Sequence, residues 1–219
     1  MGVAERKQTE RNARVKLILD SAAAVFREKG FRDSTIEDIA ARAKIAKGTI
    51  YLYFKSKSDL YFCLVEPALE SLSKRLIEIA QDKEDGPDNR MRRLGRAIYD
   101  FYERDTDEYF FLIRYNEDEY PKLLPEDRLA RFKCIMRCNL EQGEIVIREG
   151  VEKGVFKNIN PYAGAVIFWS VFIGMIHFQE NRMKQGKKDY RKATLDYLGI
   201  FIDGLHTHEL NASMSTFIV

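Results

Sequence analysis

Apolar residues recur at three- and four-residue steps along most of the 219-residue chain, and this spacing is the feature that most restricts its fold. Val15, Ile18, Ala22 and Val25 are one example, and Gly30 follows them where a helix would end. Alternation of apolar and polar residues over a strand-like length is absent from the sequence. The sequence therefore predicts an all-α protein.

Turn formers and capping residues divide the chain into about nine helices. Thr35 and Asp38 have the spacing of a capping box, as do Ser56 and Asp59, so a helix should begin at each pair. The predicted helices cover residues 11–29, 35–43, 47–53, 57–82, 89–104, 107–115, 126–153, 161–184 and 189–206. We expect a small domain over residues 1–56, a larger helical domain over 57–207 and a poorly ordered tail over 208–219.

The formal net charge of +2 is unevenly distributed along the chain. Residues 1–55 contain 12 lysines and arginines against 7 aspartates and glutamates, whereas the rest of the chain contains 24 against 27. Only the amino-terminal part therefore has the excess of positive charge that a polyanion such as DNA attracts.

Residues 35–60 have the spacing of a helix-turn-helix, in which a tight turn joins two short helices that precede a long one. Apolar side chains are placed to hold the two short helices together, namely those of Ile39, Ala40, Ile45, Ile50 and Phe54. The start of the second short helix then faces outward, and we expect it to enter the major groove of DNA.

The candidate DNA-binding residues lie on or beside these two helices: Thr35, Lys47, Gly48, Thr49, Tyr51, Tyr53, Lys55 and Lys57. The three lysines can neutralise phosphates, and Gly48 has no side chain to hold the helix away from DNA. Thr49 can touch a base edge or a thymine methyl group, and the two tyrosines combine a hydroxyl with apolar area. Thr35 lies at a helix amino terminus, where free amides favour a phosphate.

The run Ile39-Ala40, Lys47-Gly48-Thr49-Ile50-Tyr51, Tyr53-Phe54-Lys55-Ser56-Lys57 and Leu60 resembles the signature of the TetR (tetracycline-repressor) family, over about residues 14–62. The resemblance implies a homodimeric repressor that leaves a near-palindromic, double-stranded DNA operator when its helical body binds a small-molecule effector. Three positions depart from the family pattern. Lys44 stands where the turn usually has Gly, Ala46 where Ser or Thr often caps the recognition helix, and Leu52 where a polar or aromatic residue is common.

The resemblance also implies dimerisation through the last two helices of the body. The helices predicted over 161–184 and 189–206 are the most apolar of the carboxy-terminal half, and small residues on them allow close packing. The candidate interface residues are Gly164, Trp169, Phe172, Ile176, Leu198, Phe201 and Leu205.

Aromatic residues are concentrated in the body, and aromatic walls suit an apolar or aromatic effector. The candidate ligand-binding residues are Phe101, Phe110, Phe111, Tyr115, Trp169 and Phe172. For each of them, ordinary packing in the core or at an interface is the alternative interpretation.

The amino terminus lacks the apolar run of a secretory signal, and Cys63, Cys134 and Cys138 are an odd number, so we expect a cytoplasmic protein with reduced thiols. Cys134 and Cys138 share one helical face, and a metal-binding or redox role for them is an alternative to a purely structural one. The uncharged segment 158–179 is almost long enough to cross a membrane. We interpret it instead as a helix buried at a subunit interface and expect no membrane partner.

Motifs of common enzyme classes, such as G-x-G-x-x-G, the Walker loop, G-x-S-x-G and H-E-x-x-H, are absent from the sequence. We therefore expect no catalysis, no cofactor and no metal. Three alternatives to a ligand-responsive regulator stay open at this point: a DNA-binding or scaffold protein controlled by a protein partner, an enzyme, and a helical hairpin whose surface is merely basic.

Overall fold

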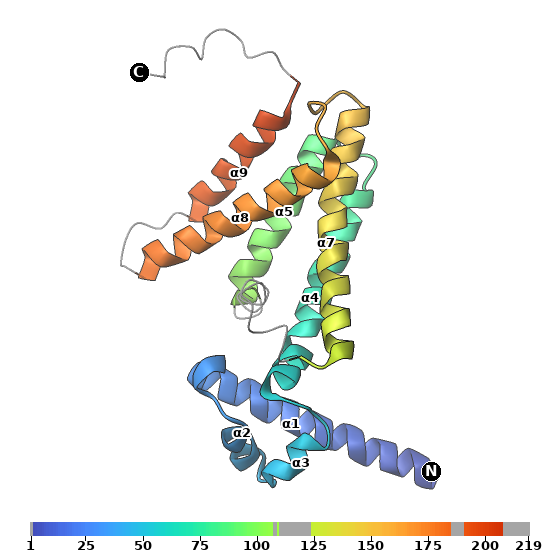
Figure 1. Ribbon diagram of the computed structural model, residues 1–219, viewed down its shortest axis with the longest axis vertical. Coiled ribbons are helices and arrows are strands. Elements are labelled where there is room, and N and C mark those ends of the chain that lie inside the picture. Colours follow the sequence, from blue (N-terminus) through green and yellow to red (C-terminus); the bar gives the residue numbers. More distant parts are fainter. Residues whose placement is uncertain (1, 107–108, 110–123, 185–190, 208–219) are drawn as a thin grey trace. The chain divides into compact units, whose positions relative to one another are not determined.

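The computed structural model describes residues 2–106, 109, 124–184 and 191–207 (Figure 1). The regular elements of these residues are helices: α1 (Val3–Asp33), α2 (Ile36–Ala43), α3 (Lys47–Tyr51), α4 (Lys57–Gln81), α5 (Pro87–Arg104), α7 (Glu126–Glu152), α8 (Pro161–Lys184) and α9 (Arg191–Leu205). The prediction of an all-α fold is confirmed. The helix predicted over 107–115 and the tail predicted over 208–219 lie outside the described residues, apart from Tyr109.

The bounds of most helices agree with the prediction to within two residues, but α1 begins at Val3 rather than near Arg11. Its first turns are exposed, so burial does not stabilise them. Local hydrogen bonds do, as between the Thr9 hydroxyl and the carbonyl oxygen of Glu5 at 2.9 Å. A periodic pattern of apolar residues cannot reveal a helix of this kind, because none of its faces is apolar.

Gly30 interrupts α1 at the position where the sequence predicts the end of the helix. Its backbone has φ 75° and ψ 164°, and a single further turn, residues 31–33, follows it. A positive φ costs glycine little because it has no Cβ. The chain is thereby redirected towards α2.

The described residues form two compact units, the first from residues 2–70, 109 and 124–134 and the second from residues 71–106, 135–184 and 191–207. The helices α4 and α7 contribute residues to both units. The boundary that we expect after residue 56 does not coincide with this division.

The core of the first unit is built from apolar residues of α1, α2, α3 and the start of α4. Its buried members are Ile18, Ala22, Val25, Phe26, Ile36, Ile39, Ala40, Ile50, Phe54 and Leu60, and Ile45 packs against them. The five residues expected to hold the two short helices together are all in this cluster. Their burial fixes which face of α3 points inward.

In the second unit, α5 and α8 both pack against α9. Four residues expected at the dimer interface face the inside of this unit instead. Phe172 and Ile176 are fully buried and Leu198 nearly so, and a Cβ on Gly164 would lie 3.1 Å from the Cδ1 atom of Ile147 on α7. These four residues pack inside the protomer. The expectation that they contact a second subunit is therefore corrected.

Trp169 is 9% exposed, and only Phe201 and Leu205 of the expected set are half-buried. Other apolar side chains of α8 and α9 reach the surface of the single chain: Tyr162, Val166, Ile167, Phe178, Tyr197 and Ile200. By length and composition alone, α8 is long and apolar enough to cross a membrane, with a mean hydropathy of 1.5 over Pro161–Glu180.

Candidate nucleic-acid interface

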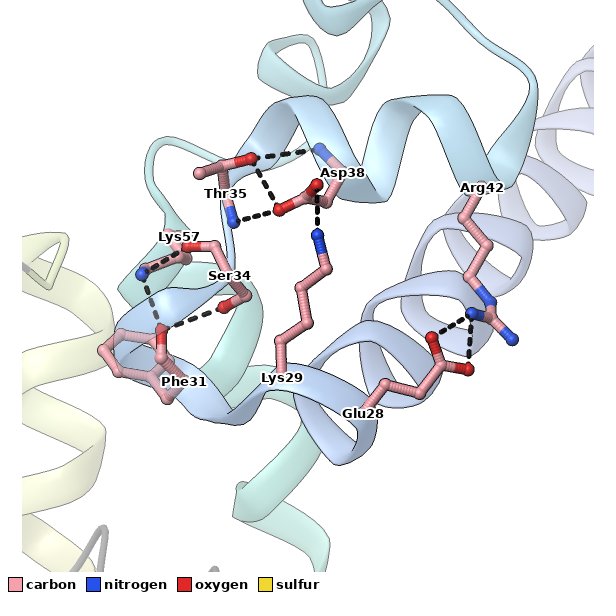
Figure 2. A network of polar contacts seen from close by, with 8 residues as sticks. All are labelled: Glu28, Lys29, Phe31, Ser34, Thr35, Asp38, Arg42 and Lys57. Carbon is pink, nitrogen blue, oxygen red and sulfur yellow. Dashed lines mark hydrogen bonds and ion pairs between the residues drawn. The ribbon is translucent and has the colours of Figure 1, made fainter.

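The start of α2 is held by the predicted capping box. The Thr35 hydroxyl accepts a hydrogen bond from the Asp38 amide at 3.1 Å, and the Thr35 amide donates one to the Asp38 carboxylate at 3.0 Å. Lys29 of α1 adds an ion pair to Asp38 at 2.7 Å, and Figure 2 shows the three residues together. The pKa of Asp38 is lowered by its hydrogen bonds to Lys29 and Thr35.

A second ion pair joins α2 to α1 near the other end of α2. The guanidinium of Arg42 contacts both carboxylate oxygens of Glu28, at 2.7 and 2.8 Å (Figure 2). Exposed pairs of this kind contribute about 0–1 kcal/mol each. The apolar core therefore sets the position of α2, and the two pairs align it.

The turn between α2 and α3 depends on Lys44, the position that departs from the family pattern. Lys44 has φ 54° and ψ 44°, a left-handed conformation that non-glycine residues seldom adopt. The Ile45 amide then donates a hydrogen bond to the Ala40 carbonyl at 3.0 Å, which closes the end of α2. The turn has the geometry that glycine would favour, although a lysine occupies it.

The recognition helix α3 begins after Ala46, which makes no side-chain capping hydrogen bond. It ends at Tyr51, two residues earlier than predicted, and Leu52 follows with 76% of its surface exposed. Ile50 is fully buried in the core of the unit. The opposite side of this short helix is consequently turned outward.

Three candidate DNA-binding residues lie on the outward side of α3. Gly48 is exposed, and a Cβ built there would meet nothing within 4 Å. Tyr51 is 48% exposed, while Thr49 is half-buried. The packing of the chain therefore does not require a glycine at position 48, and its expected contact with DNA stays a prediction.

Lys47 is also exposed, but it is not isolated. Its ammonium group forms an ion pair with Glu37 at the start of α2 and lies 5.8 Å from the centre of the Tyr51 ring. The hydrogen bond to Glu37 raises the pKa of Lys47 and lowers that of Glu37. Glu37 is not recognisable from the sequence as part of this surface, because its pairing with Lys47 depends on how the two helices pack.

Lys57 has a structural position rather than the expected place at the DNA surface. Its ammonium group donates to the carbonyl oxygens of Phe31 at 2.6 Å and Ser34 at 2.8 Å (Figure 2). It also donates to the carbonyl oxygen of Arg32 at 3.3 Å. It also lies 4.4 Å from the centre of the Phe31 ring, and burial lowers its pKa. These contacts use its three N–H donors at the end of α1, so its assignment to phosphate contact is corrected.

The remaining candidates at this surface are Lys55 and Tyr53. Lys55 is exposed, and its ammonium group is accessible because its ion pair with Asp127 is long, at 3.9 Å. Tyr53 is half-buried, and the guanidinium carbon of Arg11 lies 5.3 Å from the centre of its ring. Arg11 was not among the expected site residues, since nothing in the local pattern relates it to Tyr53.

Of the candidate ligand-binding residues, Phe101, Trp169 and Phe172 are buried in the second unit. Phe110, Phe111 and Tyr115 lie outside the described residues. Phe101 lines a cavity of about 220 Å³ between α4 and α5, together with Ser71, Leu72, Arg75, Ala97, Asp100 and Arg104. A second, more apolar cavity of about 350 Å³ is lined by residues of α8 and α9. All three cysteines lie within the described residues and none is in a disulfide.

A capped α2, a tight turn and an α3 with one buried and one open side form a helix-turn-helix, so the fold and the site define a DNA-binding protein. Residues 18–63 match the family model described as bacterial regulatory proteins of the tetR family. The transcriptional repressor KstR2 of Mycobacterium tuberculosis is 30% identical over 149 residues, which are 67% of this chain and 70% of that protein. The chain therefore belongs to the TetR family of transcriptional regulators.

Solved structures share the fold over nearly the whole chain. FadR of Bacillus subtilis in complex with stearoyl-CoA matches with a TM-score of 0.63 and 20% identity, covering 87% of this chain and 99% of that one. AibR in complex with isovaleryl coenzyme A and operator DNA matches with a TM-score of 0.63 and 18% identity, covering 85% and 97%.

Proposed function

We propose that this regulator is a homodimeric repressor that binds a near-palindromic operator through α3 and is released by an acyl-coenzyme A thioester. The observation that carries the DNA-binding half is the orientation of α3, with Ile50 buried and Gly48 and Tyr51 facing outward. A helix so placed presents its amino-terminal residues to base edges in the major groove. One such helix reads few base pairs, so useful specificity calls for two copies.

The effector class is argued from relatives and from charge. FadR binds stearoyl-CoA and AibR binds isovaleryl coenzyme A, two acyl groups of very different length on one anionic carrier. In this chain, Arg75 and Arg104 line the cavity beside Phe101, and guanidinium groups suit phosphate oxygens. The cavity is far smaller than a coenzyme A thioester, so it would hold only part of the ligand. The function so proposed places the protein in the cytoplasm, with its operator.

Binding measured in one thermodynamic cycle tests both halves. An operator is first selected from random duplex DNA, and long- and short-chain acyl-CoA thioesters, free coenzyme A and free fatty acid are titrated with and without it. We expect a thioester to bind, and operator and thioester to lower each other's affinity by the same factor. A chain that selects no DNA sequence would refute the DNA-binding half. A thioester that binds without changing operator affinity would refute the effector half alone.

A further inference from the structure

The amino-terminal turns of α1 extend beyond the part of that helix that packs in the first unit. Ile18 is the first buried residue of the core, and the side chains described before Val15 are exposed. Figure 1 shows this end of α1 continuing past α3 to the amino terminus. A helical segment without burial is retained here by local hydrogen bonds, so its surface is available for another function.

A basic stripe, defined as Lys7, Arg11 and Arg14, runs along this extension. With 3.6 residues per turn, these three positions continue the face on which Ile18 and Val25 are buried further along the helix. All three side chains are exposed. The face that packs against protein in the second half of α1 is therefore positively charged and uncovered in the first half.

The contact between Arg11 and Tyr53 fixes the direction in which the stripe points. The Arg11 guanidinium lies over the ring of Tyr53, two residues after the end of α3. The stripe is thus on the side of α1 that faces the end of the recognition helix. On that helix, Gly48 and Tyr51 are exposed.

Nearby carboxylates do not neutralise the stripe. Glu10 forms its ion pair with Arg6, at 3.3 Å, and Glu5 accepts a hydrogen bond from the Gly2 amide at 2.7 Å. Within the described part of the chain, neither Lys7 nor Arg14 has a carboxylate within ion-pair distance. Uncompensated cations beside a DNA-reading helix are best matched by the phosphates of the same duplex.

We propose that Lys7, Arg11 and Arg14 contact backbone phosphates of the DNA that flanks the base pairs read by α3. This inference rests on the proposed operator binding and adds a second contact region to it. Lys7 and Arg14 are separated by about 10 Å along the helix axis, so the stripe can reach more than one phosphate of a strand. Such contacts hold the head, meaning helices α1, α2 and α3, on the duplex and carry no sequence information.

The test compares two double variants of α1 that remove the same charge. K7A/R14A removes cations of the stripe, whereas K16A/R27A removes exposed cations from the opposite side of the helix. Affinity for a duplex selected by the wild type, and for a scrambled duplex, is measured at several salt concentrations. We expect K7A/R14A to reduce the slope of log K against log salt by about 2. It should lower the affinity for both duplexes by the same factor. K16A/R27A should leave the slope nearly unchanged.

Helicity and melting temperature establish that each variant is folded, and K7R/R14K should restore the slope of the wild type because charge alone is required. If K7A/R14A has the slope of the wild type, or loses no more than K16A/R27A does, the stripe does not contact DNA. A wild type that selects no DNA would instead refute the proposed function. The two failures are therefore distinguishable.

Discussion

Gly48 and Ile50 belong to the same five-residue helix, and their surroundings differ completely. Ile50 is fully buried, whereas a Cβ at position 48 would meet no atom within 4 Å. At the scale of single residues, the head thus separates side chains that build the fold from those that face a partner. Changes at the second kind should alter binding without loss of stability.

Gly48→Ala tests this separation directly. Alanine is favoured over glycine in a helix by about 1 kcal/mol, so the variant should be at least as stable as the wild type. Its methyl group would nevertheless hold α3 away from DNA, and we expect operator affinity to fall at least tenfold. Thermal unfolding and fluorescence anisotropy measure the two effects. A G48A variant with normal affinity would mean that this side of α3 does not lie against DNA.

Glu37→Gln should strengthen DNA binding. Glu37 holds the ammonium group of Lys47 in an ion pair and places a negative charge at the same surface. Without that charge, Lys47 is available to a phosphate, so affinity should rise and the salt slope should steepen by up to about one. Glu28→Gln removes the same charge from the pair with Arg42 and is the control. If both variants raise the affinity equally, the cause is the overall electrostatic field of helices α1 to α3 and not the release of Lys47.

Lys44→Gly should stabilise the protein by about 1 kcal/mol, because glycine adopts the left-handed conformation of this turn without the steric cost that lysine bears. Urea denaturation gives the free energy of unfolding of both proteins. Lys44→Ala is the matched control, since it also removes the charge and retains the Cβ. Equal stability of the glycine and alanine variants would show that the turn stores no strain.

At the scale of elements, helices are tied together by charged side chains whose partners are distant in sequence. Lys57, at the start of α4, bonds three carbonyl oxygens at the end of α1. In the second unit, Arg90 of α5 is fully buried, pairs with Glu149 of α7 at 2.7 Å and donates to the Ala80 carbonyl of α4 at 2.8 Å. Three helices therefore meet at one guanidinium group.

Glu149→Gln should destabilise the protein by about 3 kcal/mol at neutral pH, because it leaves the buried charge of Arg90 without a counter-ion. Hydrogen bonds from Arg90, Lys153 and Lys83 hold the pKa of Glu149 far below its usual value. The wild type should therefore exceed E149Q in free energy of unfolding by the full amount above about pH 5. This difference should decline as pH falls through the unfolded-state pKa of a glutamate, near 4.3, towards the lower folded-state pKa.

Urea denaturation between neutral pH and about pH 3.5 measures this decline. Glu144→Gln is the control, since Glu144 pairs with the exposed Arg148 one turn away on the same helix and should contribute less than about 1 kcal/mol. A difference between the wild type and E149Q that does not depend on pH would contradict the role of the carboxylate charge.

At the scale of the whole molecule, exposed apolar side chains on α8 and α9 are the feature that a lone chain leaves unexplained. Ile200 is 69% exposed and Ile167 is 50% exposed, although neighbouring positions are buried. A homodimer that covers this surface would remove apolar area from water in both subunits. Such burial between subunits would also explain why residues 158–179 carry no charged side chain.

Ile200→Glu should therefore convert the proposed dimer into monomers, because it would bury an unpaired carboxylate in each subunit. Light scattering over a range of protein concentrations measures the change. Ile145→Glu, at an exposed apolar position of α7, is the control and should remain dimeric. If wild type and I200E have the same mass, the interface lies elsewhere.

The sequence by itself determined the helices, the capping box at Thr35 and the helix-turn-helix, since each depends on spacing or hydrogen bonds within a few residues. The resemblance to the TetR family marked Lys44 as a departure from the usual turn residue, and the structure shows its left-handed backbone. The sequence did not reveal the exposed start of α1, because that segment has no apolar face.

Only the tertiary structure decided which side of an apolar helix faces inward. Because α8 is apolar on nearly all sides, its periodicity could not separate buried Phe172 and Ile176 from exposed Ile167. The structure likewise assigned Lys57 to carbonyl oxygens and Arg11 to the ring of Tyr53, although lysine and arginine on a basic head look equally suited to phosphate. Such assignments depend on which groups folding brings within reach, and residues far apart in the chain leave no local pattern that records it.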